Sequence, residues 1–335
     1  MAILVSVVIP MFDEEDNAEH TLSEVAATLG ATAWEFEIVP VSDGSRDGTA
    51  DALTRLAASD PRIRPIVYKV NRGRGYALRR GFEHASGDFV ATLDADLSYS
   101  ADHVVRMVQA LIEDPDAEMV LGSCYMPGGS TVGVPFMRLA ASRIGNSILR
   151  EALERPVYTS TGILRAYRAR VLRALDLEAD GKEIHLEILS KAQSLGMRII
   201  EIPATLTARK SGYSHFRPKE TITTHLLFSL LERPARIFAG LGLLLVIASI
   251  LIGGYLFAVY LGGGLNPERP FMTVMVLLFL GGMIGLSFAV LAMQLLQIRR
   301  DLVRVQREVL SLRETRRAED REYLDRTSDR TGAPS

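Results

Sequence analysis

The sequence predicts an α/β domain over residues 1–232, built on a mostly parallel sheet and followed by two long apolar helices. Strand and helix signals alternate along those 232 residues, a pattern typical of a sheet with helices on both faces. Two later apolar segments each exceed the roughly 20 residues that cross about 30 Å of hydrocarbon. The chain has 335 residues, which is enough for one large domain with an appendage.

The α/β domain is predicted from runs of apolar and β-branched residues that alternate with segments of helical spacing. Five runs predict strands, at residues 4–9, 36–41, 63–68, 89–93 and 117–122. Helical spacing of apolar residues predicts helices between them, at residues 17–29, 49–58, 76–84 and 103–113. Because parallel strands end at one edge of a sheet, we expect the segments that follow these strands to lie together.

The later part of the domain has a looser order. Residues 136–153 combine apolar side chains at helical spacing with several arginines, and such a composition suits a helix lying on a membrane surface. An ordinary amphipathic surface helix remains an open alternative. A second interfacial helix is predicted at about residues 219–232.

The apolar segments at residues 237–260 and 271–298 predict a transmembrane helical hairpin over residues 237–298. Arg233 and Arg236 precede it, and Arg299 and Arg300 follow it. Basic flanks of this kind place both ends of the hairpin in the cytoplasm. We therefore expect a protein of the cell membrane whose α/β domain and termini are cytoplasmic; a buried hairpin in a soluble core is the alternative. Residues 299–335 predict a charged tail, helical and then disordered.

The bulk composition excludes some classes of function. The formal net charge is −2, which gives no global electrostatic reason to bind nucleic acid. Cys124 is the single cysteine, so no disulfide can form within the chain. A homo-oligomer through the hairpin or the C-terminal helix is compatible with the sequence.

The strongest local signal is LDADL at residues 93–97, where an apolar strand ends at two aspartates. Asp94 and Asp96 occupy alternate positions, which in a strand aims both carboxylates the same way. Two hard oxygen donors can hold Mg²⁺ or Mn²⁺, with diphosphate oxygens and water completing the shell. An Asp-x-Asp motif taken alone usually marks only a polar loop.

Three other strands end in segments suited to a nucleotide. After the first strand, Phe12 can pack on a base or ribose and Glu14 can accept a hydrogen bond, while Asp13 or Asp16 can instead cap the next helix. After the second strand, Asp43 can accept from a base or ribose. Asp47 and Thr49 are better suited to the turn and the helix cap. After the third strand, the glycines around Arg74 allow backbone to approach a phosphate.

The ordered series VSVVIPMFDEE, SDGSRDGT, NRGRGYALRRGF and ASGDFVATLDADL resembles glycosyltransferase family 2. The branch that it resembles is that of the dolichyl- and polyprenyl-phosphate sugar synthases, including bacterial members with two membrane helices after the domain. The resemblance implies a GT-A fold, a UDP- or GDP-sugar donor and Mg²⁺ or Mn²⁺ held by Asp94 and Asp96. It implies a donor site made of Pro10, Phe12, Glu14, Asp43, Arg74, Asp94 and Asp96.

The same resemblance implies an acceptor site for a lipid phosphate. Arg138 and Ser142 stand where that branch places phosphate-binding residues, and Arg209 and His215 lie in RKSGYSH, which resembles Arg-x-x-Gly-x-Ser-Lys. With Asp94 and Asp96, Arg138 and Arg209 are the residues expected to act in catalysis.

The chain departs from this branch at three places. Cys124 stands where arginine is usual, the expected Asp is missing before Thr161-Gly162, and Ser98 replaces a glutamine. Arg165 and Arg168 are candidates for the missing charge, or else ordinary surface residues.

The nature of the acceptor decides whether a general base is needed. A phosphate is already anionic at neutral pH, whereas a hydroxyl must lose a proton as it attacks. For a hydroxyl acceptor, the candidates are Glu183, His185 and Glu187, although a structural role suits that segment better.

The sequence thus predicts inverting sugar transfer to a polyprenyl phosphate at the cytoplasmic membrane face. The alternatives are a member of the same family with another lipid, glycan or protein acceptor, or a non-catalytic membrane scaffold that binds sugar nucleotides.

Overall fold

A computed structural model describes residues 3–135, 156–208, 234–263 and 270–295, and also residues 139, 142, 143, 146, 297, 298 and 302. The chain divides into two compact units, residues 1–226 and residues 227–335. The predicted interfacial helix at 219–232 lies outside the described residues, as does most of the one at 136–153. Apart from residue 302, the charged tail also lies outside them.

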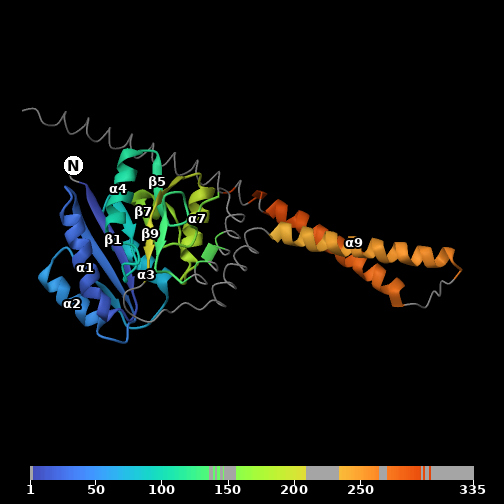
Figure 1. The fold of residues 1–335 in the computed structure, drawn as a ribbon, viewed down its shortest axis with the longest axis horizontal. Helices are drawn as coiled ribbons and strands as arrows, with labels where there is room; N and C mark the ends of the chain where they lie inside the picture. The colour runs from blue at the N-terminus through green and yellow to red at the C-terminus, as the bar shows by residue number, and fades with distance from the viewer. Residues whose placement is uncertain are drawn as a thin grey trace, which may run out of the picture. The chain divides into compact units, whose positions relative to one another are not determined.

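The first unit is a sheet with helices packed around it (Figure 1). The sheet has seven strands in the order β3-β2-β1-β4-β7-β5-β8. Its strands are β1 (Leu4–Met11), β2 (Glu35–Asp43), β3 (Ile66–Tyr68), β4 (Phe89–Thr92), β5 (Ala117–Ser123), β7 (Arg165–Arg168) and β8 (Arg198–Pro203). Neighbouring strands are parallel except at β7, which runs antiparallel to both β4 and β5. Two short strands, β6 (Ser130–Val132) and β9 (Thr205–Thr207), pair with each other outside this sheet.

Helices cover both faces of the sheet, as the sequence predicts. The helices are α1 (Glu15–Gly30), α2 (Thr49–Ser59), α3 (Arg74–His84), α4 (Asp102–Glu113), α6 (Ala169–Ala174) and α7 (Ile184–Ser194). Along β1, Val5, Val7 and Ile9 pack with α1, α2 and α4, whereas Val8 packs with α3, α6 and α7 on the opposite face. The alternation of apolar residues along β1 thus divides the core into two layers.

The strand register brings four loops to one edge of the sheet. Met11 at the end of β1 pairs with Ser42 near the end of β2, and Asp43 pairs with Tyr68 at the end of β3. β4 is parallel to β1 and ends at Thr92. The segments after β1, β2, β3 and β4 therefore leave the sheet at the same edge, which is called the carboxyl edge below.

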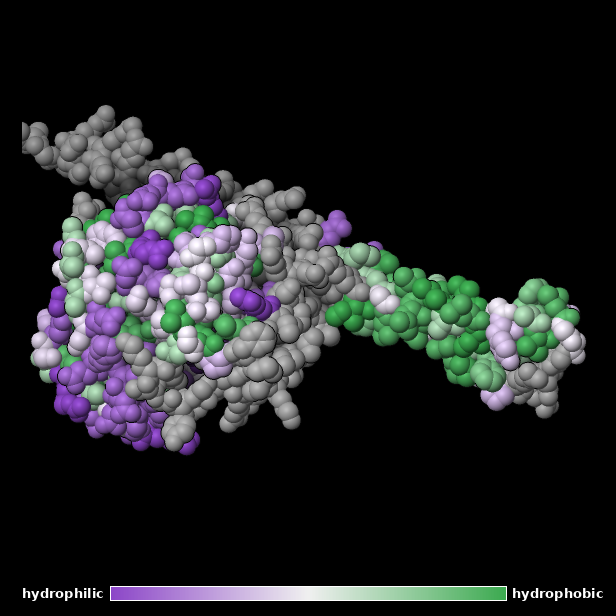
Figure 2. All heavy atoms as spheres, in the orientation of Figure 1, coloured by the Kyte–Doolittle hydropathy of each residue, from purple (hydrophilic) through white to green (hydrophobic). Residues whose placement is uncertain are grey.

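The second unit contains two apolar helices, α9 (Pro234–Leu261) and a helix over Pro270–Leu295, as predicted. Both are long and apolar enough to cross a membrane, by length and composition, and apolar residues cover the surface that Figure 2 shows for them. Their backbones come close together at glycines: a Cβ atom on Gly242 would lie 2.8 Å from the carbonyl oxygen of Gly282. Small residues of this kind let helix backbones meet.

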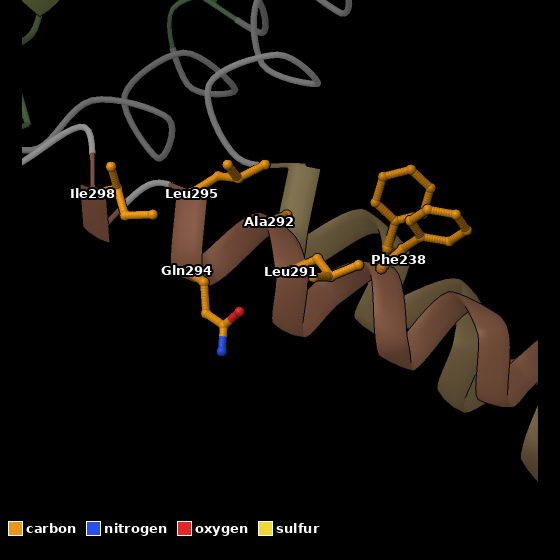
Figure 3. Close-up of a pocket in the computed structure, with 7 residues that line it drawn as sticks. Phe238, Leu291, Ala292, Gln294, Leu295 and Ile298 are labelled. Atoms are coloured by element: carbon orange, nitrogen blue, oxygen red, sulfur yellow. The ribbon is translucent and has the colours of Figure 1, made fainter.

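A hollow of about 450 Å³ lies between these two helices (Figure 3). Its lining is apolar except for the amide of Gln294, which points away from the ring of Phe238. The Phe238 and Phe288 rings lie side by side, with 5.6 Å between their centroids. The hollow thus offers dispersion contacts and almost no polar partner.

Candidate active site

The two aspartates of LDADL lie in a turn directly after β4. The strand ends at Thr92, two residues before Asp94, so the pair does not continue the pleat as expected. The Asp96 carboxylate accepts a hydrogen bond from the backbone N–H of Ser98 (2.9 Å), and Leu97 has a left-handed φ of 49°. A large side chain rarely adopts that conformation, which tends to occur where function constrains the backbone.

The acidic pair fits a divalent ion that takes its remaining ligands from outside the protein. Asp94 and Asp96 are both partly exposed at the carboxyl edge. Among the described residues, no group of three or more His, Cys, Asp or Glu side chains converges to form a complete metal site. Two carboxylates with diphosphate oxygens and water make the kind of oxygen shell that Mg²⁺ and Mn²⁺ prefer.

Arg74 lies beside the acidic pair. It is the first residue of α3, and its Nη2 atom lies 3.3 Å from Oδ1 of Asp94. The ion pair joins the loop after β3 to the turn after β4. A cation and a carboxylate that are both partly exposed can exchange partners when an anion and a metal ion arrive.

The glycines around Arg74 have a different partner from the one expected. The backbone N–H groups of Gly75 and Tyr76 donate to the carbonyl oxygen of Asp180, at 2.7 and 3.1 Å. A Cβ atom on Gly73 or Gly75 would lie 2.5 or 2.3 Å from a carbonyl oxygen of residues 179–180. These glycines therefore admit a neighbouring backbone segment, and the expectation that they open this helix start to a phosphate is wrong for these two N–H groups.

Asp43 shapes the loop that carries Arg74. Its side chain is buried, and its two carboxylate oxygens accept from the backbone N–H groups of Arg72 and Gly73, each at 2.8 Å. Burial and the nearby Asp43 carboxylate raise the pKa of the Tyr68 hydroxyl. Asp43 thus has a clear structural task, and its contact with a base or ribose stays a prediction.

The loops after β1 and β2 are joined by reciprocal hydrogen bonds. The backbone N–H of Glu14 donates to the Thr49 hydroxyl (2.9 Å), and that of Glu15 donates to Asp47 (3.1 Å). In return the N–H of Gly48 donates to the Glu15 carboxylate (2.9 Å). Burial alone would raise the pKa of Asp47, but its hydrogen bonds outweigh that effect and lower it. Asp47 and Thr49 serve the turn, as predicted, whereas the cap position of α2 (Thr49–Ser59) is occupied by Gly48 and not by either of them.

Asp13 belongs to the same network. Its carboxylate accepts from the backbone N–H of Arg46 (2.7 Å), and its φ of 53° is left-handed. Within the described residues no side chain caps the start of α1, so the capping role considered for Asp13 or Asp16 is wrong. Pro10 and Phe12 are partly buried at the start of this loop, next to the partly buried Glu14.

Only part of the predicted acceptor site can be placed. Arg138, Arg209 and His215 lie outside the described residues, whereas Ser142 lies in a helical turn. Asn146, one turn later, donates from its side chain to the backbone oxygen of Ser142 (3.1 Å). The Asn146 side-chain oxygen accepts from both the N–H and the hydroxyl of Ser160, which ties this turn to the loop before β7.

Arg165 is buried and Arg168 is partly buried, and both side chains bind backbone oxygens. Arg165 is only 1% exposed, and its guanidinium donates to the backbone oxygens of Ser160, Gly162 and His185 at 2.6 to 2.8 Å. Burial lowers its pKa. Arg168 likewise donates to backbone oxygens, including that of Ala117 (2.8 Å). Both arginines bind backbone carbonyl groups of segments far from them in the chain or in neighbouring loops.

The segment considered as a source of a general base is structural in this fold. The Glu187 carboxylate accepts from the N–H groups of Glu178 and Ala179, and Glu183 accepts from the N–H of Gly181. His185 is buried, and its pKa lies well below the ordinary value because of burial and the nearby Arg165 and Arg74. Glu183 and Glu187 thus hold residues 178–181, the segment that meets the start of α3.

Comparison with known proteins identifies the class. Residues 6–176 match the family described as Glycosyl transferase family 2, and the chain belongs to that family. The resemblance seen in the sequence is thereby confirmed.

Two relatives illustrate the match. The chain is 34% identical over 214 residues to the undecaprenyl-phosphate 4-deoxy-4-formamido-L-arabinose transferase of Edwardsiella ictaluri. This match covers 63% of the present chain and 62% of that protein. It is 30% identical over 215 residues to the polyprenol monophosphomannose synthase of Mycolicibacterium smegmatis, in a match that covers 62% of this chain and 79% of that protein. The chain thus matches less than two thirds of the first relative's length.

Solved structures support the fold. Glucosyl-3-phosphoglycerate synthase from Mycobacterium tuberculosis is similar with a TM-score of 0.53 and 20% identity, over 69% of this chain and 80% of that one. The predicted GT-A-like α/β fold is confirmed. At this identity the likeness concerns the fold alone.

Proposed function

We propose that this glycosyltransferase moves a sugar from a UDP- or GDP-sugar to a polyprenyl phosphate, with inversion at the anomeric carbon. The contact between Arg74 and Asp94 (3.3 Å) carries the proposal, because it brings the basic loop and the acidic pair together at the carboxyl edge. The names of the two relatives, which refer to undecaprenyl phosphate and to a polyprenol, support the choice of acceptor.

The proposed donor site uses the loops of the carboxyl edge. Asp43 and Phe12 are assigned to the nucleoside and Arg74 to the diphosphate, while Asp94 and Asp96 hold Mg²⁺ or Mn²⁺. Pro10 and Glu14 complete this site. When bound, the ion supplies Lewis-acid stabilisation to the departing diphosphate. A solved structure of the M. tuberculosis synthase contains Mn²⁺ and UDP, which is consistent with this assignment (TM-score 0.52).

The chain's own residues are proposed to act mainly by position and charge. A phosphate acceptor arrives as an anion and needs no proton removed, so the buried His185 and the engaged Glu183 and Glu187 are not needed as bases. Arg138, Ser142, Arg209 and His215 are assigned to an anion pocket for that phosphate, with Arg138 and Arg209 also taking part in catalysis. Direct attack of the phosphate oxygen on the anomeric carbon gives inversion.

The two apolar helices are proposed to span the membrane with both termini in the cytoplasm, because basic residues flank the hairpin. A domain anchored in this way meets a lipid acceptor by a search in two dimensions. The proposed domain limits are 1–232 for the catalytic part and 237–298 for the hairpin.

The test uses the purified full chain with radiolabelled nucleotide sugars, polyprenyl phosphate and Mn²⁺ or Mg²⁺. We expect labelled lipid with one donor and none after chelation. Asp96→Ala is expected to abolish transfer, and Asp51→Ala, at an exposed aspartate of α2, is the matched control. Absence of labelled lipid with every donor contradicts the proposed acceptor.

One observation favours a second candidate function, in which the sugar is transferred to an acceptor other than a polyprenyl phosphate. Cys124 is buried at the end of β5, where the resembled branch usually has arginine. Label found on a different lipid, a glycan or a protein establishes that alternative. Sugar-nucleotide binding without any transfer by the wild-type chain supports the scaffold instead.

A further inference from the structure

Five polar side chains from three segments form a cluster that includes Tyr99, a residue close to Asp94. Tyr99 follows the LDADL turn, Cys124 and Tyr125 follow β5, and Ser142 and Arg143 share one helical turn. The guanidinium carbon of Arg143 lies 5.9 Å from the centroid of the Tyr125 ring. Stacking on a ring uses the face of a guanidinium and leaves the N–H groups at its edge for an anion.

Two described neighbours of Arg143, the Cys124 thiol and the Tyr125 hydroxyl, have raised pKa values. Burial raises the pKa of the Cys124 thiol, although hydrogen bonding with Tyr99 and Tyr125 and the nearby Arg143 act in the opposite direction. Burial also raises the pKa of the Tyr125 hydroxyl, against the influence of a hydrogen bond with Ser142. In the part of the chain that the structure describes, no carboxylate forms an ion pair with Arg143.

This cluster is continuous with the acidic pair. Burial raises the pKa of Tyr99, and the nearby Cys124 and Asp94 add to the rise. Tyr99 is thus close enough to both Asp94 and Cys124 to feel their charge. An exposed cation with hydroxyl groups around it, and with no ion pair to a carboxylate among the described residues, is a suitable environment for a phosphate monoester.

We propose that Arg143, with the hydroxyl groups of Ser142 and Tyr125, binds the phosphate group of the acceptor. This inference rests on the proposed function and names a residue that the sequence motifs did not indicate. Arg143 supplies, from the helical turn, the positive charge that Cys124 does not supply from the end of β5. The phosphate is placed next to Asp94 and Asp96, where its oxygen can reach the anomeric carbon.

The test compares acceptor and donor kinetics in the full-length protein. Arg143→Ala is expected to raise the KM for polyprenyl phosphate about tenfold or more, because one lost charge-assisted hydrogen bond corresponds to roughly that factor. The KM for the nucleotide sugar and the Kd for the nucleoside diphosphate stay within about twofold. Arg55→Ala, at an exposed arginine of α2, is the matched control and leaves all three values unchanged.

A double variant tests the exchange of charge between the two positions. Cys124→Arg combined with Arg143→Ala is expected to recover at least part of the acceptor affinity that Arg143→Ala loses, without a change in donor affinity. Recovery supports the inference independently of how well the single variant folds. Inactive wild-type protein contradicts the proposed function itself. An active wild type with an unchanged acceptor KM in Arg143→Ala, or an effect confined to the donor, overturns the role of Arg143.

Discussion

Gly75→Ala tests the contact that fixes Arg74. Gly75 is the second residue of α3, and its N–H donates to the carbonyl oxygen of Asp180 (2.7 Å). A Cβ atom at this position would lie 2.3 Å from the oxygen of Ala179 and 2.7 Å from the oxygen of Gly181. Real Cβ atoms essentially never come within 3.0 Å of a non-bonded atom, so the Ala179 oxygen must move away by at least the difference between 2.3 and 3.0 Å.

The expected cost follows from what that movement breaks. Two hydrogen bonds to Asp180 weaken, those of Gly75 and Tyr76, each worth about 1 kcal/mol net. Overpacking adds roughly 1–3 kcal/mol. Alanine regains about 1 kcal/mol through its better helix propensity. We therefore expect Gly75→Ala to lower the free energy of unfolding by about 2–4 kcal/mol and to weaken donor binding, because Arg74 moves with the start of α3.

The single tryptophan provides the assay. Trp34 is partly buried against the core of the α/β unit, so its fluorescence reports urea unfolding of that unit in the detergent-solubilised full chain. Gly30→Ala is the matched control, since nothing lies within 4 Å of a Cβ atom built on Gly30 at the end of α1. Equal unfolding midpoints for the two variants would refute the idea that residues 179–181 constrain the start of α3.

Three further predictions use the same unfolding assay. Asp43→Asn keeps the side-chain volume but replaces one of the two acceptor oxygens with an NH₂ donor that faces a backbone N–H. We therefore expect the free energy of unfolding to fall by about 1.5–3 kcal/mol. An unchanged urea midpoint contradicts this prediction. Glu37 is buried, which alone raises its pKa, but hydrogen bonds from Ser6, Ser86 and Arg64 outweigh burial and lower it below 4.5. Its stabilising effect is therefore present above pH 4.5 and is lost as the pH falls through the lowered pKa, so Glu37→Gln should be less stable at pH 7 and less sensitive to acid. In Arg165→Lys, the lysine cannot bind all three carbonyl groups at once, so we expect the free energy of unfolding to fall by about 2–4 kcal/mol. A variant as stable as the wild type would show that those carbonyl groups find other partners.

Much of the fold could be predicted because the apolar pattern of its first strands is strong. β1, β2, β4 and β5 lie where apolar runs predict strands, within one or two residues at each end. β3 is shorter than predicted and begins at Ile66, although Ile63 still forms an isolated bridge with Ile38. These strands have continuous apolar residues because helices bury both of their faces.

The later strands gave no comparable signal. β7 has four residues, two of which are arginines, so its sequence resembles a surface segment. It lies inside the sheet because Arg165 and Arg168 donate to backbone oxygens of neighbouring segments. Such partners come from residues far apart in the chain, and no local pattern reveals them.

In the candidate site, too, some features could be predicted from local sequence and others depend on contacts between distant segments. Asp43, Arg74 and Asp94 follow consecutive parallel strands, so their gathering at one edge follows from strand order. The role of Asp180 could not be predicted, because a backbone oxygen has no sequence signature. Arg143 was also missed, since its position over the Tyr125 ring depends on how two distant segments meet.

The carbonyl group of Asp180 has a consequence for protein engineering. It couples residues 73–76 to a segment about a hundred positions further along the chain, so the part that carries the donor loops is not a self-contained module. A chimera that imports residues 1–100 from a relative to change its sugar preference must import the matching 177–183 segment as well. Transplants that ignore this pairing should yield misassembled hybrids even where each half is individually compatible with the fold.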